Sequence, residues 1–398
     1  MNQRYYSLDV FRGATVALMI LVNNPGSWAY IYSPLEHANW HGCTPTDLVF
    51  PFFLFALGNA MAFVMPKFEQ KGTSFFLRKV TRRTLLILAI GLFLNWSPFI
   101  QWKDNHLVLK SWENIRILGV LQRIALCYFF ASLIVYFTKT RTSKIICAAI
   151  LLGYWLLCWM FGDKNNPYSL TGFFGTDIDK SILGASHMYK GEGVTFDPEG
   201  LTSTIAAIVQ VVLGYYTGKY IREKGKNPGN MPDKITITNY SPYEMLSHLF
   251  IAGAILIFIG FCWDLIFPIN KKIWTSSYVL YTTGLALMAI GLLIYLVEFR
   301  KARGAWSRFF NVFGKNPLFI FFLSGFLPRI LALFRWVDHR TPDGKPVYIS
   351  PFPWFYEHIC KPLFTNLKNG SLLYALCMVA FYWVIVYFLD KKKIYIKV

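Results

Sequence analysis

Charged residues are scarce in this chain of 398 residues: only 15% are Asp, Glu, Lys or Arg, whereas 55% are hydrophobic and 18% aromatic. A soluble globular domain carries about 25% charged residues. The deficit excludes a protein whose surface lies mostly in water and favours one that faces lipid. Acidic residues are the scarcest, 21 against 40 Lys and Arg, so the formal net charge is +19.

Three further absences narrow the class of protein. Residues 1–13 carry Arg4, Asp9 and Arg12 and have no apolar stretch with a small-residue cleavage site, so we expect no cleaved signal peptide. The seven cysteines contain no CxxC pair, and nothing else in the sequence indicates a metal site. We find no internal repeat of the length typical of transporters, and no separate soluble domain.

Long apolar runs dominate what remains. Each is about 18 to 25 residues long, enough to cross roughly 30 Å of hydrocarbon. We therefore expect an all-α, polytopic helical membrane protein that forms one transmembrane domain over residues 1–398. The ten expected spans are residues 10–31, 47–65, 82–97, 117–138, 144–161, 201–219, 244–267, 274–298, 316–335 and 371–389.

The distribution of basic residues predicts the orientation. With a cytoplasmic N-terminus and ten alternating spans, most of the 40 Lys and Arg residues fall on the inner side, as the positive-inside rule requires. Both termini are then cytoplasmic, and the basic charge reports topology and not a nucleic-acid partner. Two outer loops, at about 162–200 and 336–370, are long and rich in aromatic residues. Such loops suit either sugar rings or an interfacial aromatic belt.

Polar titratable residues cluster at the outer mouth of the second span. Residues 37–51 read HANWHGCTPTDLVFP, so they place His37, Trp40, His41 and Asp47 together. Asn23 lies about 22 Å along the first helix and reaches the same level. An imidazole at such a place can act as a base or a nucleophile at neutral pH. The grouping of Asn23, His37 and Asp47 therefore predicts a reaction centre.

Two arginines form a second anomaly. Arg123 falls inside the fourth expected span, and Arg116, seven residues earlier, is expected on the same helix face. A guanidinium within the membrane must be paired. Asp47 lies at a suitable depth to be the partner of Arg123, and a helix-packing ion pair is the alternative.

Basic residues also gather at the inner ends of the spans. Asp9, at the start of the first helix, is expected to be structural because it complements the helix dipole. The ninth span opens at Asn316, and a helix N-terminus beside a lysine suits phosphate. A cationic rim for a phosphorylated ligand would comprise Arg12, Lys79, Arg82, Arg83 and Lys315. The alternative is that these residues are only the positive-inside signal.

Several of these segments resemble the heparan-α-glucosaminide N-acetyltransferase family. The matching segments are residues 7–13, 37–51, 116–123 and 197–200, and more loosely 314–318, in this order along most of the chain. That family moves acetyl groups across membranes from acetyl-coenzyme A to glucosamine. The resemblance implies that His37, before Ala-x-Trp, is the catalytic histidine, and it matches Asn23 to an asparagine late in the first helix.

The resemblance implies a function as well. We expect an enzyme of the cell inner membrane that transfers acetyl from cytosolic acetyl-coenzyme A to the amine of a glucosamine-type sugar or glycan terminus on the periplasmic side, with no metal. His37 would act as a base or carry the acetyl group, Asn23 would polarise the thioester or orient His37, and Asp47 would fix the histidine tautomer. The family also implies a homodimer.

The residues expected to contact the acceptor sugar are Trp40, His41, Arg116, Arg123, Asp197 and Glu199.

Two rival functions remain open. A sugar permease would bind its ligand near the bilayer midplane and commonly has repeats, whereas the polar residues here gather near the outer face. An O-acyltransferase of cell-envelope glycans would share the topology and differ only in its acceptor.

Overall fold

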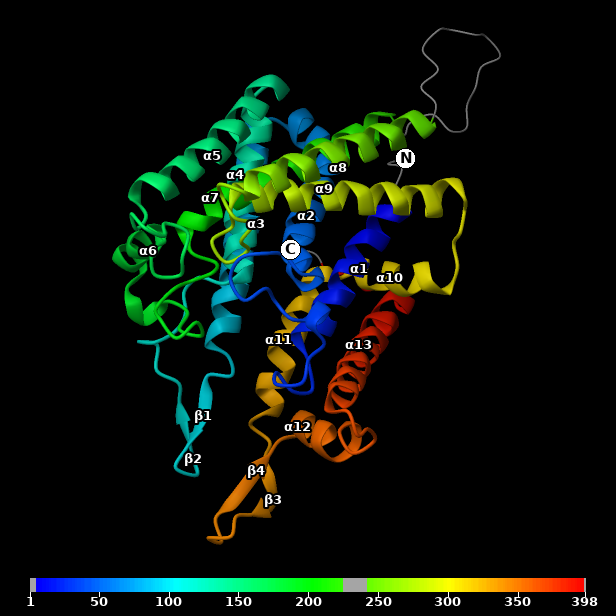
Figure 1. Ribbon diagram of the computed structural model, residues 1–398. Coiled ribbons are helices and arrows are strands. Elements are labelled where there is room, and N and C mark those ends of the chain that lie inside the picture. Colours follow the sequence, from blue (N-terminus) through cyan, green and yellow to red (C-terminus); the bar gives the residue numbers. More distant parts are fainter. Residues whose placement is uncertain (1–4, 225–241, 397–398) are drawn as a thin grey trace.

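The computed structural model describes residues 5–224 and 242–396 and is a bundle of long helices with two small hairpins at one end (Figure 1). The long helices are α1 (Tyr6–Asn23), α2 (Val49–Lys71), α3 (Thr73–Trp96), α4 (Val120–Phe137), α5 (Thr140–Phe161), α7 (Leu201–Lys224), α8 (Pro242–Asp264), α9 (Ser276–Ile294), α10 (Ala305–Lys315), α11 (Pro317–Leu331) and α13 (Leu367–Lys391). The polytopic helical class expected from the sequence is therefore confirmed.

A helix lies in each of the ten expected spans, but the first ends at Asn23, so residues 24–31 were wrongly included in that span. Moreover, not all of these helices are long and apolar enough to cross a membrane. Within the described residues eight pass this criterion, and α10 and α11, which meet at a bend of 79°, would together make a ninth. The third expected span lies in α3, which has 24 residues. Its first half carries Arg78, Lys79, Arg82 and Arg83, so only its second half is apolar.

The two expected outer loops contain short ordered elements. Residues 162–200 include α6 (Gly175–Leu183) and the 3₁₀ turn η3 (Ala185–His187). Residues 336–370 form the hairpin β3 (Trp336–Arg340)–β4 (Pro346–Ile349), α12 (Pro351–Phe355) and the π-helical turn η5 (Tyr356–Cys360). A similar π-helical turn, η4 (Tyr295–Phe299), ends α9.

A second hairpin, β1 (Ile100–Lys103)–β2 (His106–Leu109), was not expected. Its two-residue turn, Asp104-Asn105, has positive φ at both positions, 47° and 63°, as the tight turn between two strands requires. The guanidinium of Arg335 lies 4.0 Å from the Trp102 ring and 4.1 Å from the Tyr348 ring, and it joins the two hairpins. Both hairpins project from the same end of the bundle (Figure 1).

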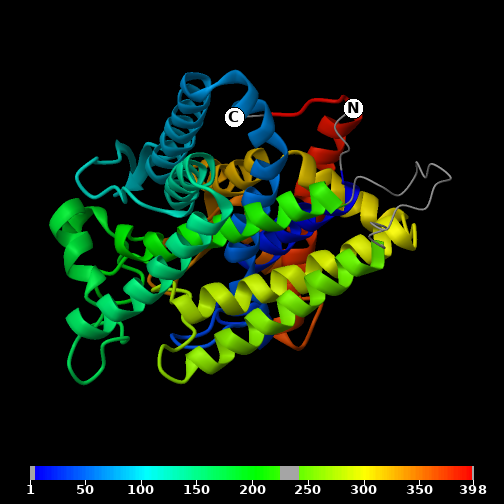
Figure 2. The same cartoon turned by 90° about the horizontal axis from the view of Figure 1, so that it is seen from above.

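Close helix contacts position the elements that bear the candidate site. α8 and α9 run side by side in both views (Figures 1 and 2). α2 packs on α7 through two glycines: a Cβ on Gly58 would lie 2.0 Å from the Val211 carbonyl oxygen, and one on Gly214 would lie 2.2 Å from that of Phe55. Small residues of this kind let backbones approach in membrane bundles. The start of α2 and the start of α7 are therefore held at a fixed separation.

Candidate functional site

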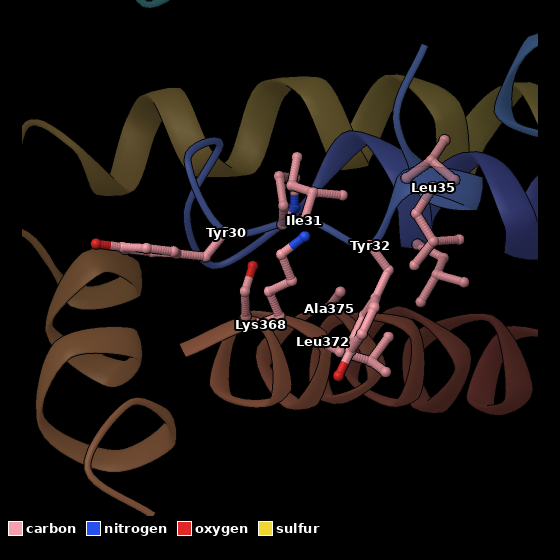
Figure 3. Close-up of a pocket in the computed structure, with 11 residues that line it drawn as sticks. Tyr30, Ile31, Tyr32, Leu35, Lys368, Leu372 and Ala375 are labelled. Carbon is pink, nitrogen blue, oxygen red and sulfur yellow. The ribbon is translucent and has the colours of Figure 1, made fainter. Parts of the chain in front are cut away.

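The loop that carries His37 is anchored on α13 before it reaches the site. The Gly26 N–H donates to the Ser371 carbonyl at 3.3 Å, and the Tyr32 hydroxyl donates to the side chain of Asn369. Figure 3 shows residues 30–35 lying along this helix. The gap between them is only about 10 Å³, roughly the space of one water molecule. This contact is therefore packing and not a ligand site.

Asp47 holds both the loop and the imidazole of His37. The 3₁₀ turn η1 (Ser33–Leu35) precedes the loop, and η2 (Pro45–Leu48) leads from it into α2. The Asp47 carboxylate closes the first turn of η2 by accepting the Thr44 N–H at 3.0 Å, and it accepts the Ala38 N–H at 3.0 Å. Its other oxygen, Oδ1, is 2.7 Å from His37 Nδ1.

Because an ionised carboxylate only accepts hydrogen bonds, the contact with Asp47 assigns the proton of a neutral His37 to Nδ1. With Nδ1–H donating to Asp47, the lone pair of Nε2 is free, and Nε2 has no hydrogen-bond partner within residues 5–224 and 242–396. The His37 side chain is 41% exposed, whereas that of Asp47 is 2% exposed. A buried carboxylate that orients a more exposed imidazole is the arrangement of a base or nucleophile with its positioning residue.

Lys271, between α8 and α9, is a third member of this group and was missed by the sequence analysis. Its ammonium nitrogen is 3.0 Å from His37 Nδ1 and 3.3 Å from Asp47 Oδ1. Burial lowers the pKa of Lys271, and the carboxylates of Asp47 and Glu199 offset only part of that effect. The sequence does contain a feature that could have identified Lys271. Lys271 and Lys272 are adjacent cations in a short loop on the outer side of the membrane, where the positive-inside rule predicts few basic residues.

Three adjoining cavities surround the group, and Val120 lines all of them. The loop cavity, about 260 Å³, lies among His37, Trp40, Glu192, Glu199, Lys271 and their neighbours in the loops. The apolar cavity, about 170 Å³, extends from His37 between α1, α2, α4 and α11. The amide cavity, about 270 Å³, lies between α1, α3, α4 and α11. His37 lies at the junction of the loop cavity and the apolar cavity.

Asn23, the last residue of α1, lines the apolar cavity and the amide cavity. Its carboxamide makes no hydrogen bond with the residues that the structure describes, and so it does not orient His37 in this structure. Asp47 has that role. The amide of Asn23 is therefore free to donate to a molecule in the cavity beside His37.

Arg116 forms ion pairs with two carboxylates, Asp197 and Glu199, which the sequence analysis expected to contact the acceptor sugar. Its guanidinium donates to Asp197 through Nε at 3.0 Å and through Nη2 at 2.5 Å, and also to Glu199. Burial alone would raise the pKa of Glu199, but the positive charges of Arg116 and Arg123 lower it. Glu199 is therefore a carboxylate, and it lines the loop cavity and the apolar cavity. Asp197, 2% exposed, is a positioning residue.

Arg123 does not pair with Asp47, and that hypothesis was wrong. It is 1% exposed and donates to Thr204 Oγ1 at 3.2 Å, to the Gly200 carbonyl at 3.3 Å and to the Ser203 hydroxyl. Gly200 immediately precedes α7, and Ser203 and Thr204 are in its first turn. Arg123 reaches these groups because α4 packs against α7. The expectation that Arg116 shares a helix face with Arg123 was also wrong, since α4 begins only at Val120.

Trp40 and His41 point in different directions. Trp40 lines the loop cavity and donates from Nε1 to the Tyr168 carbonyl at 2.7 Å, and Lys272 lies 5.7 Å from its ring centre. His41 Nδ1 lies 3.4 Å from the amide of Asn270. Burial lowers the pKa of His41, and the charge of Asp264 opposes that effect only in part.

The five cations expected to bind phosphate fall into two groups. Arg12 donates to Asp9 at 3.3 Å and to the Gly314 carbonyl at 3.0 Å, and Lys315 forms an ion pair with Asp390 at 2.8 Å. The others lie on α3: Lys79 faces the Phe75 ring, Arg83 lies 4.7 Å from the Tyr128 ring, and Arg82 borders a broad surface hollow. A rim made of all five stays a prediction.

Comparisons with known proteins agree with the resemblance seen in the sequence. Residues 4–173 match the family model of the catalytic region of heparan-alpha-glucosaminide N-acetyltransferase. Over 99% of its length the chain is 26% identical to the heparan-alpha-glucosaminide N-acetyltransferase of Mus musculus, and equally to that of Homo sapiens. The chain spans 60% of the length of these curated relatives. The matched region includes His37, Asp47, Asn23 and Arg116, and the resemblance to the heparan-alpha-glucosaminide N-acetyltransferase family is thereby confirmed.

Proposed function

We propose that this multi-pass membrane protein transfers acetyl from acetyl-coenzyme A to the amine of a glucosamine-type sugar. The observation that carries the proposal is the pair of His37 and Asp47, 2.7 Å apart. His37, whose Nε2 is free, lines both a polar cavity formed by loops and an apolar cavity inside the bundle. A polar acceptor and a thin acyl donor can therefore meet at one imidazole.

The apolar cavity fits the donor in size and chemistry. It is about 170 Å³, and besides His37, Asn23, Glu199 and Lys271 most of its lining is aliphatic or aromatic. Such a slot suits a narrow acyl-pantetheine arm but not a bulky nucleotide. We therefore propose that the nucleotide stays at the cytoplasmic ends of the spans, at some of Arg12, Lys79, Arg82, Arg83 and Lys315, with the termini on that side.

The acceptor would enter through the loop cavity. Glu199 and Glu192 supply carboxylates that attract an ammonium group, and Trp40 supplies a ring of the kind that packs on sugars. Both carboxylates already have a cationic partner, Lys272 for Glu192 and Arg116 for Glu199. We assign Glu199 to the amine because, like His37, it lines both the loop cavity and the apolar cavity. On this proposal the cavity faces the periplasm, and the protein lies in the cell inner membrane.

His37 would act in one of two ways. As a base, its Nε2 accepts the proton that the attacking amine loses while the N–C bond forms and the C–S bond breaks, and the departing thiolate then takes up that proton. As a carrier, Nε2 itself attacks the acetyl carbonyl, the C–S bond breaks and coenzyme A leaves as a thiolate. The amine then attacks the acetyl-imidazole, the bond from the acetyl carbon to Nε2 breaks, and the proton that the amine loses passes through the freed Nε2 to the thiolate. In both cases Asp47 stabilises the positive charge that develops on the imidazole.

Negative charge on the acetyl oxygen needs a donor. Asn23, whose amide is free, and Lys271 both line the apolar cavity. We propose that these two side chains stabilise the oxyanion, because donors fixed in advance within a dry cavity are effective there. Asn23 then polarises the thioester and does not orient His37.

The test is acetyl transfer by purified protein from labelled acetyl-coenzyme A to a set of aminosugars and, in parallel, to sugars that offer only hydroxyl groups. His37→Ala should lower the rate by at least about 10²–10⁴-fold, the contribution of a general base. His106→Ala, on the exposed strand β2, is the matched control and should keep the parent rate. Acetylation of hydroxyl groups alone would support the O-acyltransferase, and full activity of the His37→Ala protein would contradict the proposal.

A further inference from the structure

The side-chain nitrogen of Lys271 lies within the proposed reaction centre. Lys271 and His37 both line the apolar cavity and the loop cavity. The Nζ atom of Lys271 is 3.0 Å from His37 Nδ1 and 3.3 Å from Asp47 Oδ1, and the side chain is 22% exposed. A primary amine of the chain therefore borders the space in which the primary amine of the acceptor is proposed to react.

The surroundings of Lys271 favour its neutral form more than those of an ordinary lysine. Burial lowers the pKa of Lys271, whereas the carboxylates of Asp47 and Glu199 favour the ammonium form. The contact with His37 also favours the amine. Because Nδ1–H donates to Asp47, an ammonium group at 3.0 Å faces it as a second donor, whereas the lone pair of an amine can accept from it. The neutral amine is the form that can attack a carbonyl carbon.

Other nucleophiles near the centre differ from Lys271 in position. Lys272 forms an ion pair with Glu192 at 2.6 Å, donates to the Asn39 carbonyl at 3.0 Å, and lines the loop cavity only. The Cys43 thiol lines none of the three cavities, and burial raises its pKa to about 12. Among the lysines and cysteines in residues 5–224 and 242–396, only Lys271 lines both cavities that His37 lines.

We infer that Lys271 is an autoacetylation site, to which the centre transfers the acetyl group when acetyl-coenzyme A is bound and no acceptor is present. The inference rests on the proposed function, because it takes the thioester to lie beside His37. In direct transfer the bond from Nζ to the acetyl carbon forms and the C–S bond breaks. If His37 already carries the acetyl group, the bond from that carbon to Nε2 breaks instead. The proton that Nζ loses passes through the imidazole to the thiolate of coenzyme A.

Acetylation of Lys271 inactivates the centre. The amide that forms has no positive charge, so it can no longer act as the ammonium donor to the acetyl oxygen. The added acetyl group also occupies part of an apolar cavity of only about 170 Å³, which the donor needs. A bound aminosugar competes with Nζ for the same acetyl group. The acceptor therefore protects the enzyme, and its absence switches the enzyme off.

The experiment incubates the purified full chain with isotope-labelled acetyl-coenzyme A and no sugar, and locates the label by peptide mass spectrometry. Label should accumulate at Lys271 at least about tenfold faster than at Lys272 or at Lys164 in an outer loop, because a positioned amine has a high effective concentration. It should resist hydroxylamine, as an amide does and an acetyl-imidazole does not. Loss of transfer activity should follow the labelling, and excess glucosamine should suppress both. Equal labelling of the three lysines would indicate unassisted chemical acetylation and overturn the inference.

Three variants provide the controls. In Lys271→Arg the stable label and the loss of remaining activity during incubation without sugar should both disappear. Lys164→Arg makes the same exchange at an exposed position and should keep both. His37→Ala should slow the labelling of Lys271 by at least about 10²-fold, the contribution of a general base. Labelling of that variant at the parent rate would show that the centre does not carry out the step, and would overturn the inference.

Labelling of Lys271 and acetylation of sugars are separate products, so the inference and the proposed function can fail separately. A protein that acetylates aminosugars but never labels Lys271 would overturn the autoacetylation and leave the proposed function. Label at Lys271 that depends on His37, without any acetylated sugar, would overturn the sugar acceptor and leave the modification site. A protein that binds coenzyme A but forms neither product would overturn both.

Discussion

At the scale of single residues, Asp47 couples backbone structure to chemistry. The same carboxylate accepts the N–H groups of Ala38 and Thr44 and the Nδ1–H of His37. Any change that moves the start of α2 therefore also moves the imidazole. A carboxylate with backbone donors stays ionised, and so the tautomer of His37 with a free Nε2 is maintained.

Lys271 gives the site a pH dependence that can be measured. Burial lowers its pKa, and the charged form exists only below the pKa. If the ammonium group stabilises the oxyanion, activity should fall as the pH rises through this lowered pKa, on the alkaline side but below the ordinary range of lysine. Lys271→Met should lower kcat by about 10²–10³-fold, the loss typical of one oxyanion donor.

The variant Lys271→Arg provides the check on this account. Arginine keeps its charge over the whole range, so the alkaline limb in the pH profile of kcat should disappear although the rate is lower than that of the parent. Coenzyme A binding by all three proteins serves as the control for folding. An alkaline limb that persists unchanged in Lys271→Arg would exclude Lys271 as its cause.

The residues of the site were predictable to different degrees. His37, Asp47 and Asn23 come from one short stretch of sequence and were found by their polarity and their family motif. Lys271 was missed because it joins the site from a segment more than 200 positions away from His37. Arg123 was paired with the wrong partner because depth in a span does not determine which neighbouring helix its side chain faces.

At the scale of elements, the packing of α2 on α7 keeps the site together. α2 begins just after Asp47, and α7 begins just after Glu199 and Gly200. Between them a Cβ on Gly58 would lie 2.0 Å from the Val211 carbonyl oxygen. Real Cβ atoms do not come so close, so any larger residue at Gly58 must push the two helices apart.

Replacing Gly58 by Ala should therefore destabilise the protein by about 1–3 kcal/mol, the usual effect of overpacking, and also reduce acetyl transfer. The measurement is the Tm in detergent together with the transfer rate. Gly153→Ala on α5 is a matched control, because a Cβ there meets no atom within 4 Å. That variant should be neutral or slightly more stable. An equal loss of Tm in both variants would contradict the packing account.

Elements were predictable where hydrophobicity alone specifies them. Apolar runs located α1, α2, α4, α5, α7, α8, α9 and α13 because each is long and apolar enough to cross a membrane. The bend between α10 and α11 was not foreseen, since Asn316-Pro317 was read only as the start of a span. The hairpin β1–β2 was missed because it depends on a turn with two positive φ angles and not on an apolar pattern.

At the scale of the whole molecule, two cavities of different chemistry, the loop cavity and the apolar cavity, meet at the imidazole of His37. The loop cavity contains carboxylates and lysines, whereas the apolar cavity has mostly aliphatic and aromatic walls. In the proposed function the donor is acetyl-coenzyme A, which is supplied on one side of the membrane and is too polar to cross it. The central claim is therefore that acetyl is passed through the bundle at His37, between substrates on opposite sides of the membrane.

Proteoliposomes test this claim most directly. Acetyl-coenzyme A is sealed inside vesicles that hold the protein with its termini inward, and glucosamine is supplied only outside. We predict that N-acetylglucosamine appears outside with the parent and the His106→Ala protein, and that none appears with the His37→Ala protein. Acetylated sugar that forms only when both substrates are on the same side of the membrane would contradict the account.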